Sequence, residues 1–242
     1  MPDLPGYGES KGPIPDPEDR NYSKRNIARL LALLMSHLGH KTYMLAGHDR
    51  GGRVGFRMAL DYPERVVAFA ALDIVPTLYA WETMGWRRAL DDYHWLFLAQ
   101  PAGVPEHLIG RDPDFYSKHL LDRWAGNRAA LDAEAIAEYV RAFRRPSVIA
   151  ATCADYRAGA NTDIIDDRAD RDAGRGIRCP VLVVWGRGYL ADQASSPLEA
   201  WRPWADQVSE VVLDCGHFVA EEEPDACADA LARFFATQTT PG

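Results

Sequence analysis

One hexapeptide places a carboxylate between glycines, directly after a short apolar run. Gly47-His48-Asp49-Arg50-Gly51-Gly52 follows residues 42–46 and precedes a helical pattern over residues 53–61. Small residues at these positions permit the strained strand-to-helix turn of a nucleophile elbow, which lifts the central side chain, here Asp49, above a sheet. A carboxylate is ionised at neutral pH, so it can attack a saturated carbon and form an ester that water must hydrolyse. The alternative is a glycine-rich turn in which Asp49 caps the next helix.

A second segment supplies a base. His217 lies in Asp214-Cys215-Gly216-His217-Phe218, on a short loop between the last predicted strand and the C-terminal helix. Nucleophile, acid and histidine in that chain order are typical of α/β-hydrolases. An imidazole with an ordinary pKa of about 6.5 can activate water, but it cannot usefully activate an aspartate that is already ionised. We therefore expect His217 to act on the ester.

The acid that orients His217 has two candidates. Asp73 stands at the end of the second predicted strand, in Leu72-Asp73-Ile74. The segment after the third strand, Trp185-Gly186-Arg187-Gly188-Tyr189, carries no acid, so Asp192 is the alternative there. We expect Asp73 to orient the histidine.

Hydropathy patterns predict the elements that position these residues. Continuous apolar runs indicate parallel strands covered on both faces, at residues 42–46, 66–72, 181–185 and 208–213. Helical spacing follows Ser23 as an N-cap up to Gly39, and recurs over residues 53–61, 132–143 and 224–235. The sequence thus predicts an α/β fold with a mostly parallel sheet and helices on both faces. Residues 1–75 and 179–242 would form the core, and residues 76–178, without a clear strand, an inserted helical cap.

The composition excludes several classes of protein. The chain has 242 residues, 47% of them hydrophobic and 26% charged, as in ordinary globular proteins. Its net charge of -8 argues against a nucleic-acid binder. Four cysteines without zinc or disulfide spacing, and the absence of a signal peptide or a membrane-length apolar run, lead us to expect a cytoplasmic protein that binds no membrane.

Five segments in order resemble the haloacetate dehalogenases of the fluoroacetate dehalogenase type, within the α/β-hydrolase superfamily. They cover nearly the whole chain and read GHDRGGR, LDIVPT, YHWLFLAQP, DYRAG and GHFVAEEEPD. The resemblance implies hydrolysis of a short 2-haloacid, such as fluoroacetate to glycolate plus halide. Asp49 would attack the carbon that bears the halogen, and His217 and Asp73 would complete the triad.

The same resemblance assigns the substrate contacts. Arg50 and Arg53 would hold the carboxylate of a small anionic substrate, and three donors would stabilise the halide: His94, Trp95 and Tyr156. No metal or organic cofactor is implied, and a homodimer stays open. Paired arginines at a helix N-terminus suit an anion. They would also offset its repulsion from Asp49, which reaches about 4 kcal/mol for charges 4 Å apart at an effective dielectric of 20. A surface ion pair is the alternative for Arg53.

The N-terminus departs from the family. Residues 3–10 (DLPGYGES) resemble the D-x-x-G-x-G-x-S loop that follows the fourth strand in α/β-hydrolases, yet only Met1 and Pro2 precede them. We therefore expect an N-terminally truncated sheet, from a misassigned start, a fragment or a chain that pairs with another. The missing loop normally supplies an oxyanion donor worth about 2.7–4 kcal/mol, and the first strand would present an open edge. Low activity of this chain alone is the expected consequence.

Two other functions remain. Epoxide hydrolases also use an elbow aspartate, together with cap tyrosines that protonate the ring oxygen, but they tend to carry Trp where this chain has Arg50. A non-catalytic remnant of an α/β-hydrolase, which keeps the fold and an anion pocket, is the third hypothesis.

Overall fold

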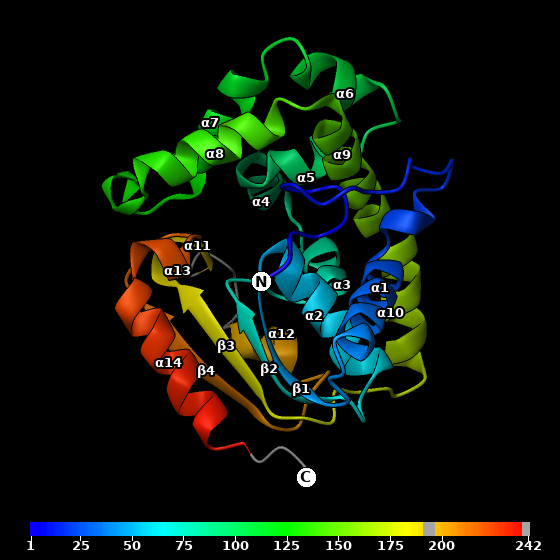
Figure 1. The fold of residues 1–242 in the computed structure, drawn as a ribbon, viewed down its shortest axis with the longest axis vertical. Helices are drawn as coiled ribbons and strands as arrows, with labels where there is room; N and C mark the ends of the chain where they lie inside the picture. Colours follow the sequence, from blue (N-terminus) through cyan, green and yellow to red (C-terminus); the bar gives the residue numbers. More distant parts are fainter. Residues whose placement is uncertain (191–196, 239–242) are drawn as a thin grey trace. The chain divides into compact units, whose positions relative to one another are not determined.

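The four strands of the described residues form one parallel sheet (Figure 1). The computed structural model describes residues 1–190 and 197–238. The strands lie in the order β1-β2-β3-β4, with β1 and β4 at the two edges of the described sheet. They comprise β1 (Tyr43–His48), β2 (Val66–Leu72), β3 (Val181–Gly186) and β4 (Val208–Leu213).

The register brings the carboxyl ends of the strands to one edge of the sheet. His48 pairs with Leu72, and Leu72 pairs with Val184. Gly186 pairs with Leu213 at the end of β4. In a parallel sheet this is where the loops that carry binding and catalytic side chains gather. The segments that follow β1, β2 and β4 therefore leave the sheet at the same edge.

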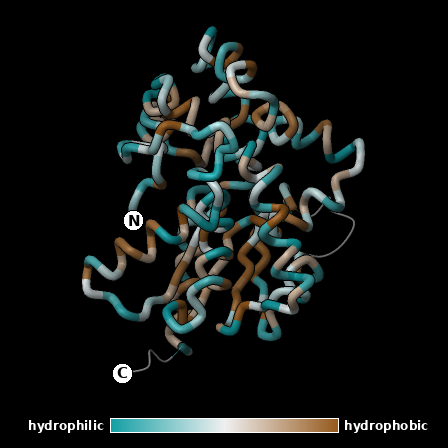
Figure 2. Tube along the Cα trace, turned by 90° about the vertical axis from the view of Figure 1, so that its right-hand side faces the viewer, coloured by the Kyte–Doolittle hydropathy of each residue, from teal (hydrophilic) through white to brown (hydrophobic). Residues whose placement is uncertain are grey.

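Helices cover both faces of the sheet. On one face, Ala70 and Leu72 of β2 pack in a buried cluster with Cys227 and Ala230 of α14 (Pro224–Ala236). On the other face, Phe69 packs edge-on against Trp201 of α12 (Pro197–Trp201), 5.9 Å between ring centroids. Coverage on both sides explains why the two central strands, β2 and β3, are apolar throughout, whereas β4 at the edge exposes Ser209 and Glu210. Figure 2 shows brown strands in the sheet. The predicted coverage of a parallel sheet by helices on both faces is confirmed.

Most element boundaries match the predictions from the sequence. Strands β2 and β4 have the predicted limits. Helix α1 (Lys24–His37) ends before Gly39, whose φ of +86° is the left-handed conformation that a C-terminal glycine supplies. Helix α2 (Arg50–Asp61) begins three residues earlier than predicted. The turn after β1 is completed by the single residue Asp49, so Arg50 already lies in the helix.

Residues 76–178 are helical, as predicted. All of them are described, and their only β pairing is a single bridge between Ile177 and Ala205. The helices in this stretch are α3 (Thr77–Glu82), α4 (Trp86–Asp91), α5 (Tyr93–Leu98), α6 (Val104–Ile109), α7 (Pro113–Trp124), η2 (Arg128–Ala130), α8 (Ala133–Phe143), α9 (Pro146–Ala160) and α10 (Thr162–Asp172). Three short helices elsewhere are η1 (Arg20–Tyr22), α11 (Arg187–Leu190) and α13 (Val219–Glu222). Among the described residues, no helix combines the length and the apolar character of a membrane span.

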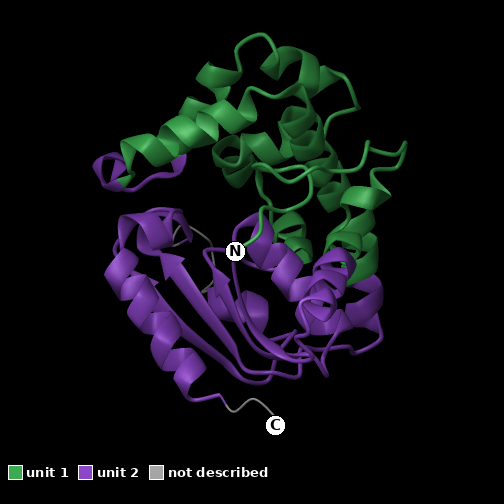
Figure 3. Ribbon diagram, in the orientation of Figure 1, with its two compact units in different colours: residues 1–27, 77–123, 131–167 green, residues 28–76, 124–130, 168–242 purple. Residues whose placement is uncertain are grey.

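The chain divides into two compact units, coloured separately in Figure 3. Unit 1 comprises residues 1–27, 77–123 and 131–167, and unit 2 comprises residues 28–76, 124–130 and 168–242. Unit 1 contains a buried ion-pair cluster in which Lys24 contacts Asp155 and lies 3.1 Å from the Asp163 carboxylate. Unit 2 contains the whole sheet. The cap boundaries at residues 76 and 178 stay a prediction.

Candidate active site

The turn after β1 has the geometry of a nucleophile elbow. Asp49 adopts φ 43° and ψ -115°, an unusual conformation for a residue other than glycine. Close backbone approach also explains two of the glycines. A Cβ on Gly47 would lie 2.5 Å from the Gly51 carbonyl oxygen, and one on Gly52 would lie 2.8 Å from the Gly47 carbonyl oxygen. A Cβ on Gly51 would meet nothing within 4 Å.

We expect Gly47→Ala to destabilise the protein and Gly51→Ala to leave it at least as stable as the parent. The new methyl group at position 47 meets backbone that cannot rotate away, and such overpacking costs roughly 1–3 kcal/mol. Alanine at position 51 enters open space in the first turn of α2, where it favours helix by up to about 1 kcal/mol. Urea unfolding of the two variants measures the difference, and equal free energies of unfolding would contradict the steric explanation.

At the carboxyl edge of the sheet, the His217 ring lies between the carboxylates of Asp73 and Asp49. The Asp73 Oδ2 atom lies 2.6 Å from Nδ1 of His217, and Nε2 of His217 lies 3.7 Å from Oδ2 of Asp49. The other oxygen of Asp73 accepts a hydrogen bond from the Gly186 backbone N–H, at 2.8 Å. Since a carboxylate accepts, Nδ1 of His217 carries a proton and Nε2 faces Asp49. The structure thus places the expected acid beside His217, and the alternative Asp192 lies outside the described residues.

The charges in this group determine its protonation. Burial acts against a charged His217, but hydrogen bonding and charge from Asp49 and Asp73 raise its pKa to about 9. Burial acts against a charged Asp49 too, yet His217, Arg50 and Arg53 hold the pKa of Asp49 well below its usual range. Burial raises the pKa of Asp73. At neutral pH the resting site therefore contains an anionic Asp49 beside a protonated His217.

Both predicted carboxylate-binding arginines lie in the first turn of α2. Arg50 is 9% exposed and Arg53 is 6% exposed, and the positive charge of each lowers the pKa of Asp49. Arg53 Nη1 donates a hydrogen bond to the Val75 carbonyl oxygen, at 3.1 Å. A surface ion pair would leave Arg53 exposed, so its burial disfavours that alternative. The arrangement places two largely buried cations beside the Asp49 carboxylate.

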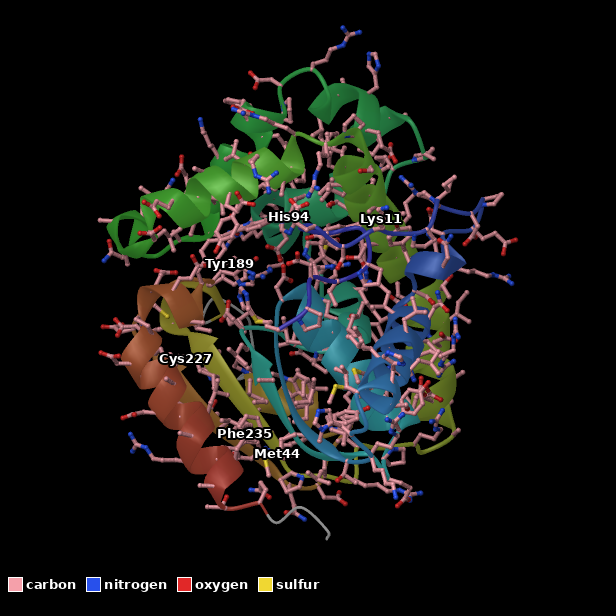
Figure 4. All side chains as sticks on the ribbon, viewed as in Figure 1. Lys11, Met44, His94, Tyr189, Cys227 and Phe235 are labelled. Atoms are coloured by element: carbon pink, nitrogen blue, oxygen red, sulfur yellow. The ribbon has the colours of Figure 1, made fainter. Side chains whose placement is uncertain are left out.

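Aromatic rings surround His217, and the sequence did not single out two of them. The Tyr189 ring centroid lies 4.4 Å from that of His217, and the Trp124 ring packs edge-on at 5.8 Å. The His48 ring lies 4.6 Å away. Tyr189, labelled in Figure 4, belongs to α11, beyond the carboxyl end of β3. Because Tyr189 and Trp124 are distant from His217 along the chain, no pattern in the sequence predicts that their rings contact it.

The three predicted halide-binding residues meet in unit 1. The His94 ring centroid lies 5.7 Å from that of Tyr156, and the Trp95 and Tyr156 rings lie 6.1 Å apart. All three are at least nine-tenths buried. Trp95 and Tyr156 also belong to an apolar cluster with Leu98 and Cys153, so packing accounts for part of their placement. Their role in halide binding stays a prediction. Among the described residues, no group of three or more His, Cys, Asp or Glu side chains could hold a metal ion.

The elbow, the aligned acid and histidine, and the parallel sheet define a hydrolase of the α/β type. The family model described as "alpha/beta hydrolase fold" matches residues 1–224, and the chain belongs to this family. The predicted fold class is confirmed.

Two curated relatives point to two activities. A fluoroacetate dehalogenase from Burkholderia sp. is 40% identical over 233 residues, covering 96% of this chain and 76% of that protein. A soluble epoxide hydrolase from Corynebacterium sp. (strain C12) is 32% identical, covering 97% of this chain and 79% of that protein. Among solved structures, an α/β hydrolase from Nostoc sp. PCC 7120 is 43% identical with a TM-score of 0.94, covering 97% of this chain and 80% of that one. The resemblance to fluoroacetate dehalogenases is thereby confirmed.

Proposed function

We propose that this hydrolase cleaves the carbon–halogen bond of short 2-haloacids and gives a 2-hydroxyacid and halide. The observation that carries the proposal is the pair of buried arginines directly after an elbow aspartate, with a histidine 3.7 Å from that aspartate. A 2-haloacid carries a carboxylate that the two buried cations can bind, whereas a neutral substrate carries none. The 40% identity to the Burkholderia fluoroacetate dehalogenase supports the same reaction class.

In the first step the Asp49 carboxylate attacks the carbon that bears the halogen. A C–O bond forms, the carbon–halogen bond breaks, and its electron pair leaves with the halide. Arg50 and Arg53 would bind the substrate carboxylate through their fork-shaped donors, which holds the carbon in line with Asp49. Because the pKa of Asp49 lies well below its usual range, the nucleophile is ionised at every pH near neutral.

In the second step His217 delivers water to the carbonyl carbon of the Asp49 ester. Ester formation removes the negative charge of Asp49, which is one of the two charges that raise the pKa of His217 to about 9. The pKa of His217 therefore falls once the ester forms, and the imidazole loses its proton to solvent. Neutral His217 then takes a proton from water as hydroxide adds to the ester. The protonated imidazole returns that proton to the departing alkoxide. The second proton of the water stays on the regenerated Asp49 carboxyl group and then passes to neutral His217, which restores the resting ion pair.

Halide release requires donors that meet the leaving ion. The proposal assigns this role to an imidazole N–H, an indole N–H and a phenol, from His94, Trp95 and Tyr156. The family resemblance supports the assignment, together with the mutual packing of the three rings in unit 1. Fluoride, as the poorest leaving halide, would depend on these donors most.

Epoxide hydrolysis is the second candidate, because the Corynebacterium relative is named a soluble epoxide hydrolase. It would use the same aspartate and histidine. The two buried arginines disfavour it, since a neutral epoxide offers them no charge to bind.

A substrate panel tests the proposal. The protein is incubated with fluoroacetate, chloroacetate and styrene oxide, and halide is followed by electrode and diol by chromatography. Halide release with no diol supports haloacid hydrolysis, whereas diol with no halide supports the epoxide reaction. Neither product, together with an unmodified Asp49 peptide by mass spectrometry, would support a non-catalytic protein. The mass measurement detects even one ester per chain, so it does not depend on rapid turnover.

We expect Arg50→Gln to lose the preference for a charged substrate. A hydrogen bond to a charged group is worth about 1.5–3 kcal/mol, so KM for chloroacetate should rise roughly 10- to 150-fold. The neutral chloroacetamide is the internal control, because its binding does not involve the guanidinium charge. The ratio of kcat/KM between the two compounds is the measurement. An unchanged ratio would show that Arg50 does not bind the substrate carboxylate.

A further inference from the structure

The carboxylate of Glu222 accepts hydrogen bonds on either side of His217. Its Oε2 atom accepts from the Gly216 backbone N–H at 3.0 Å, and its Oε1 atom accepts from the Phe218 backbone N–H at 3.1 Å. Oε2 also accepts from the Asn127 backbone N–H at 2.7 Å. Glu222 is 8% exposed, so these bonds form largely away from water. One side chain thus binds both neighbours of His217 in the loop.

His48 holds the peptide of His217 itself. Nε2 of His48 lies 2.8 Å from the His217 backbone carbonyl oxygen. A carbonyl oxygen can only accept, so His48 carries its proton on Nε2 and donates it. Burial, followed by the charge of His217, lowers the pKa of His48 to about 4. His48 is therefore a neutral donor throughout the physiological range, and it adds no second positive charge beside His217.

The loop that carries His217 passes through a narrow space. A Cβ on Gly216 would lie 2.1 Å from the backbone nitrogen of Gly126, and one on Gly186 would lie 2.0 Å from the Gly216 carbonyl oxygen. The His217 backbone N–H donates to the Trp124 carbonyl oxygen at 2.9 Å. A side chain at position 216 would collide with backbone. Besides the ring packing around His217, backbone bonds and two polar side chains therefore hold the loop here.

We propose that Glu222 and His48 are positioning residues that clamp the loop of residues 216–218 and keep the His217 imidazole in place to hydrolyse the Asp49 ester. The inference rests on the proposed function, since it assigns the clamp to the second chemical step. Glu222 lies in α13, whereas the nucleophile lies in the turn between β1 and α2, so loss of Glu222 displaces the base while the attacking carboxylate keeps its position. His48 directly precedes Asp49, so its donor is tested separately by rescue.

Separate rates for ester formation and ester hydrolysis distinguish a positioning role from a purely structural one. A positioning role slows only hydrolysis, whereas a structural defect slows both steps. Displacement of a catalytic group by about 1 Å can cost on the order of 100-fold in rate. Glu222→Gln leaves one accepting oxygen where the parent has two, and its amide N–H₂ faces backbone donors. Rapid-mixing experiments with chloroacetate should show an initial halide burst at the parent rate, followed by ester hydrolysis roughly 10- to 100-fold slower. The Asp49 ester should then accumulate in the steady state and be visible by mass spectrometry.

Glu223→Gln is the matched control. It removes the same charge by the same chemical change one residue along the chain, and the Glu223 side chain makes no cap hydrogen bond to α14. Both the burst and the hydrolysis rate should stay at the parent values. If Glu222→Gln slows both steps equally, or if Glu223→Gln slows hydrolysis as much, the clamp does not act on His217 and the proposal is wrong.

His48 offers a test by rescue. His48→Phe keeps a ring but loses the donor, whereas His48→Gln keeps an N–H donor at a similar reach. We expect the Phe variant to accumulate ester and the Gln variant to recover most of the hydrolysis rate. Similar hydrolysis rates in the two variants would overturn the role of the donor.

A measurement without substrate separates failure of the clamp from failure of the proposed function. In the parent, contacts with Asp49 and Asp73 raise the pKa of His217 to about 9. NMR titration of His217 should show this pKa falling toward 6.5 in His48→Phe but not in His48→Gln, and neither change alters a charge at neutral pH. Unchanged titration of His217 in His48→Phe would refute the clamp. Normal clamp behaviour in a protein that releases no halide would refute only the dehalogenation.

Discussion

His217→Ala is expected to release at most one halide ion per protein molecule and then to stop. Attack by Asp49 does not need the imidazole, because Arg50 and Arg53 still stabilise the ionised carboxylate. Hydrolysis of the ester does need it, and general base catalysis contributes about 10²- to 10⁴-fold. The peptide that contains Asp49 should gain the mass of one carboxymethyl group after incubation with fluoroacetate or chloroacetate.

The control for this experiment is His40→Ala, which removes an exposed histidine away from the site. It should turn over repeatedly, as the parent does. Multiple turnovers in His217→Ala would mean that another group activates water. Halide without modification of the Asp49 peptide would mean that water attacks the substrate directly, and the covalent route would have to be abandoned.

The fold was largely predictable because its two central strands, β2 and β3, are apolar on both faces. A run such as residues 66–72 has no alternation to misread, and its flanking polar residues mark both ends. The start of α2 was harder, because the glycines after Asp49 resemble a loop. Their small size instead lets the helix begin directly against β1, where a Cβ on Gly52 would lie 2.8 Å from the Gly47 carbonyl oxygen.

The triad geometry was predictable for a topological reason. Asp49, Asp73 and His217 each follow a strand of one parallel sheet, and parallel strands end at a common edge. Contacts that depend on side-chain reach were not predictable. Glu222 stands in a run of three glutamates, and nothing in that run says which of them turns inward to hold the loop. The rings of Tyr189 and Trp124 meet His217 only after folding.

Asp49→Asn is expected to abolish halide release and to lower the pKa of His217. An amide oxygen carries no net charge and is a poor nucleophile, so neither halide nor a modified peptide should be detected. The same change removes one of the two carboxylates that raise the pKa of His217 to about 9. That pKa should move down toward 6.5 while Asp73 still holds Nδ1 at 2.6 Å. NMR titration of the imidazole measures the shift.

The loss of the Asp49 charge should also change how the free energy of unfolding depends on pH. In the parent, the pKa of His217 is higher in the folded protein than the ordinary value of about 6.5, so its ion pairs stabilise the fold fully below pH 6.5. That contribution is lost as the pH rises toward 9. Asp49→Asn should lose less stability between pH 6.5 and 9 in urea unfolding. Asp214→Asn, which changes a carboxylate that is 94% exposed, should keep the parent pH dependence.

The asparagine variant is informative because its neutral side chain has the same charge as the ester. The pKa of His217 in Asp49→Asn therefore approximates its pKa while the ester awaits water. If that value lies below about 7, most of the imidazole is unprotonated at neutral pH during the hydrolytic step, although it is protonated in the resting protein. Ester formation would then itself convert His217 from a charge partner of Asp49 into a base. A pKa that stays near 9 in this variant would leave the imidazole protonated throughout and would exclude His217 as the general base at neutral pH.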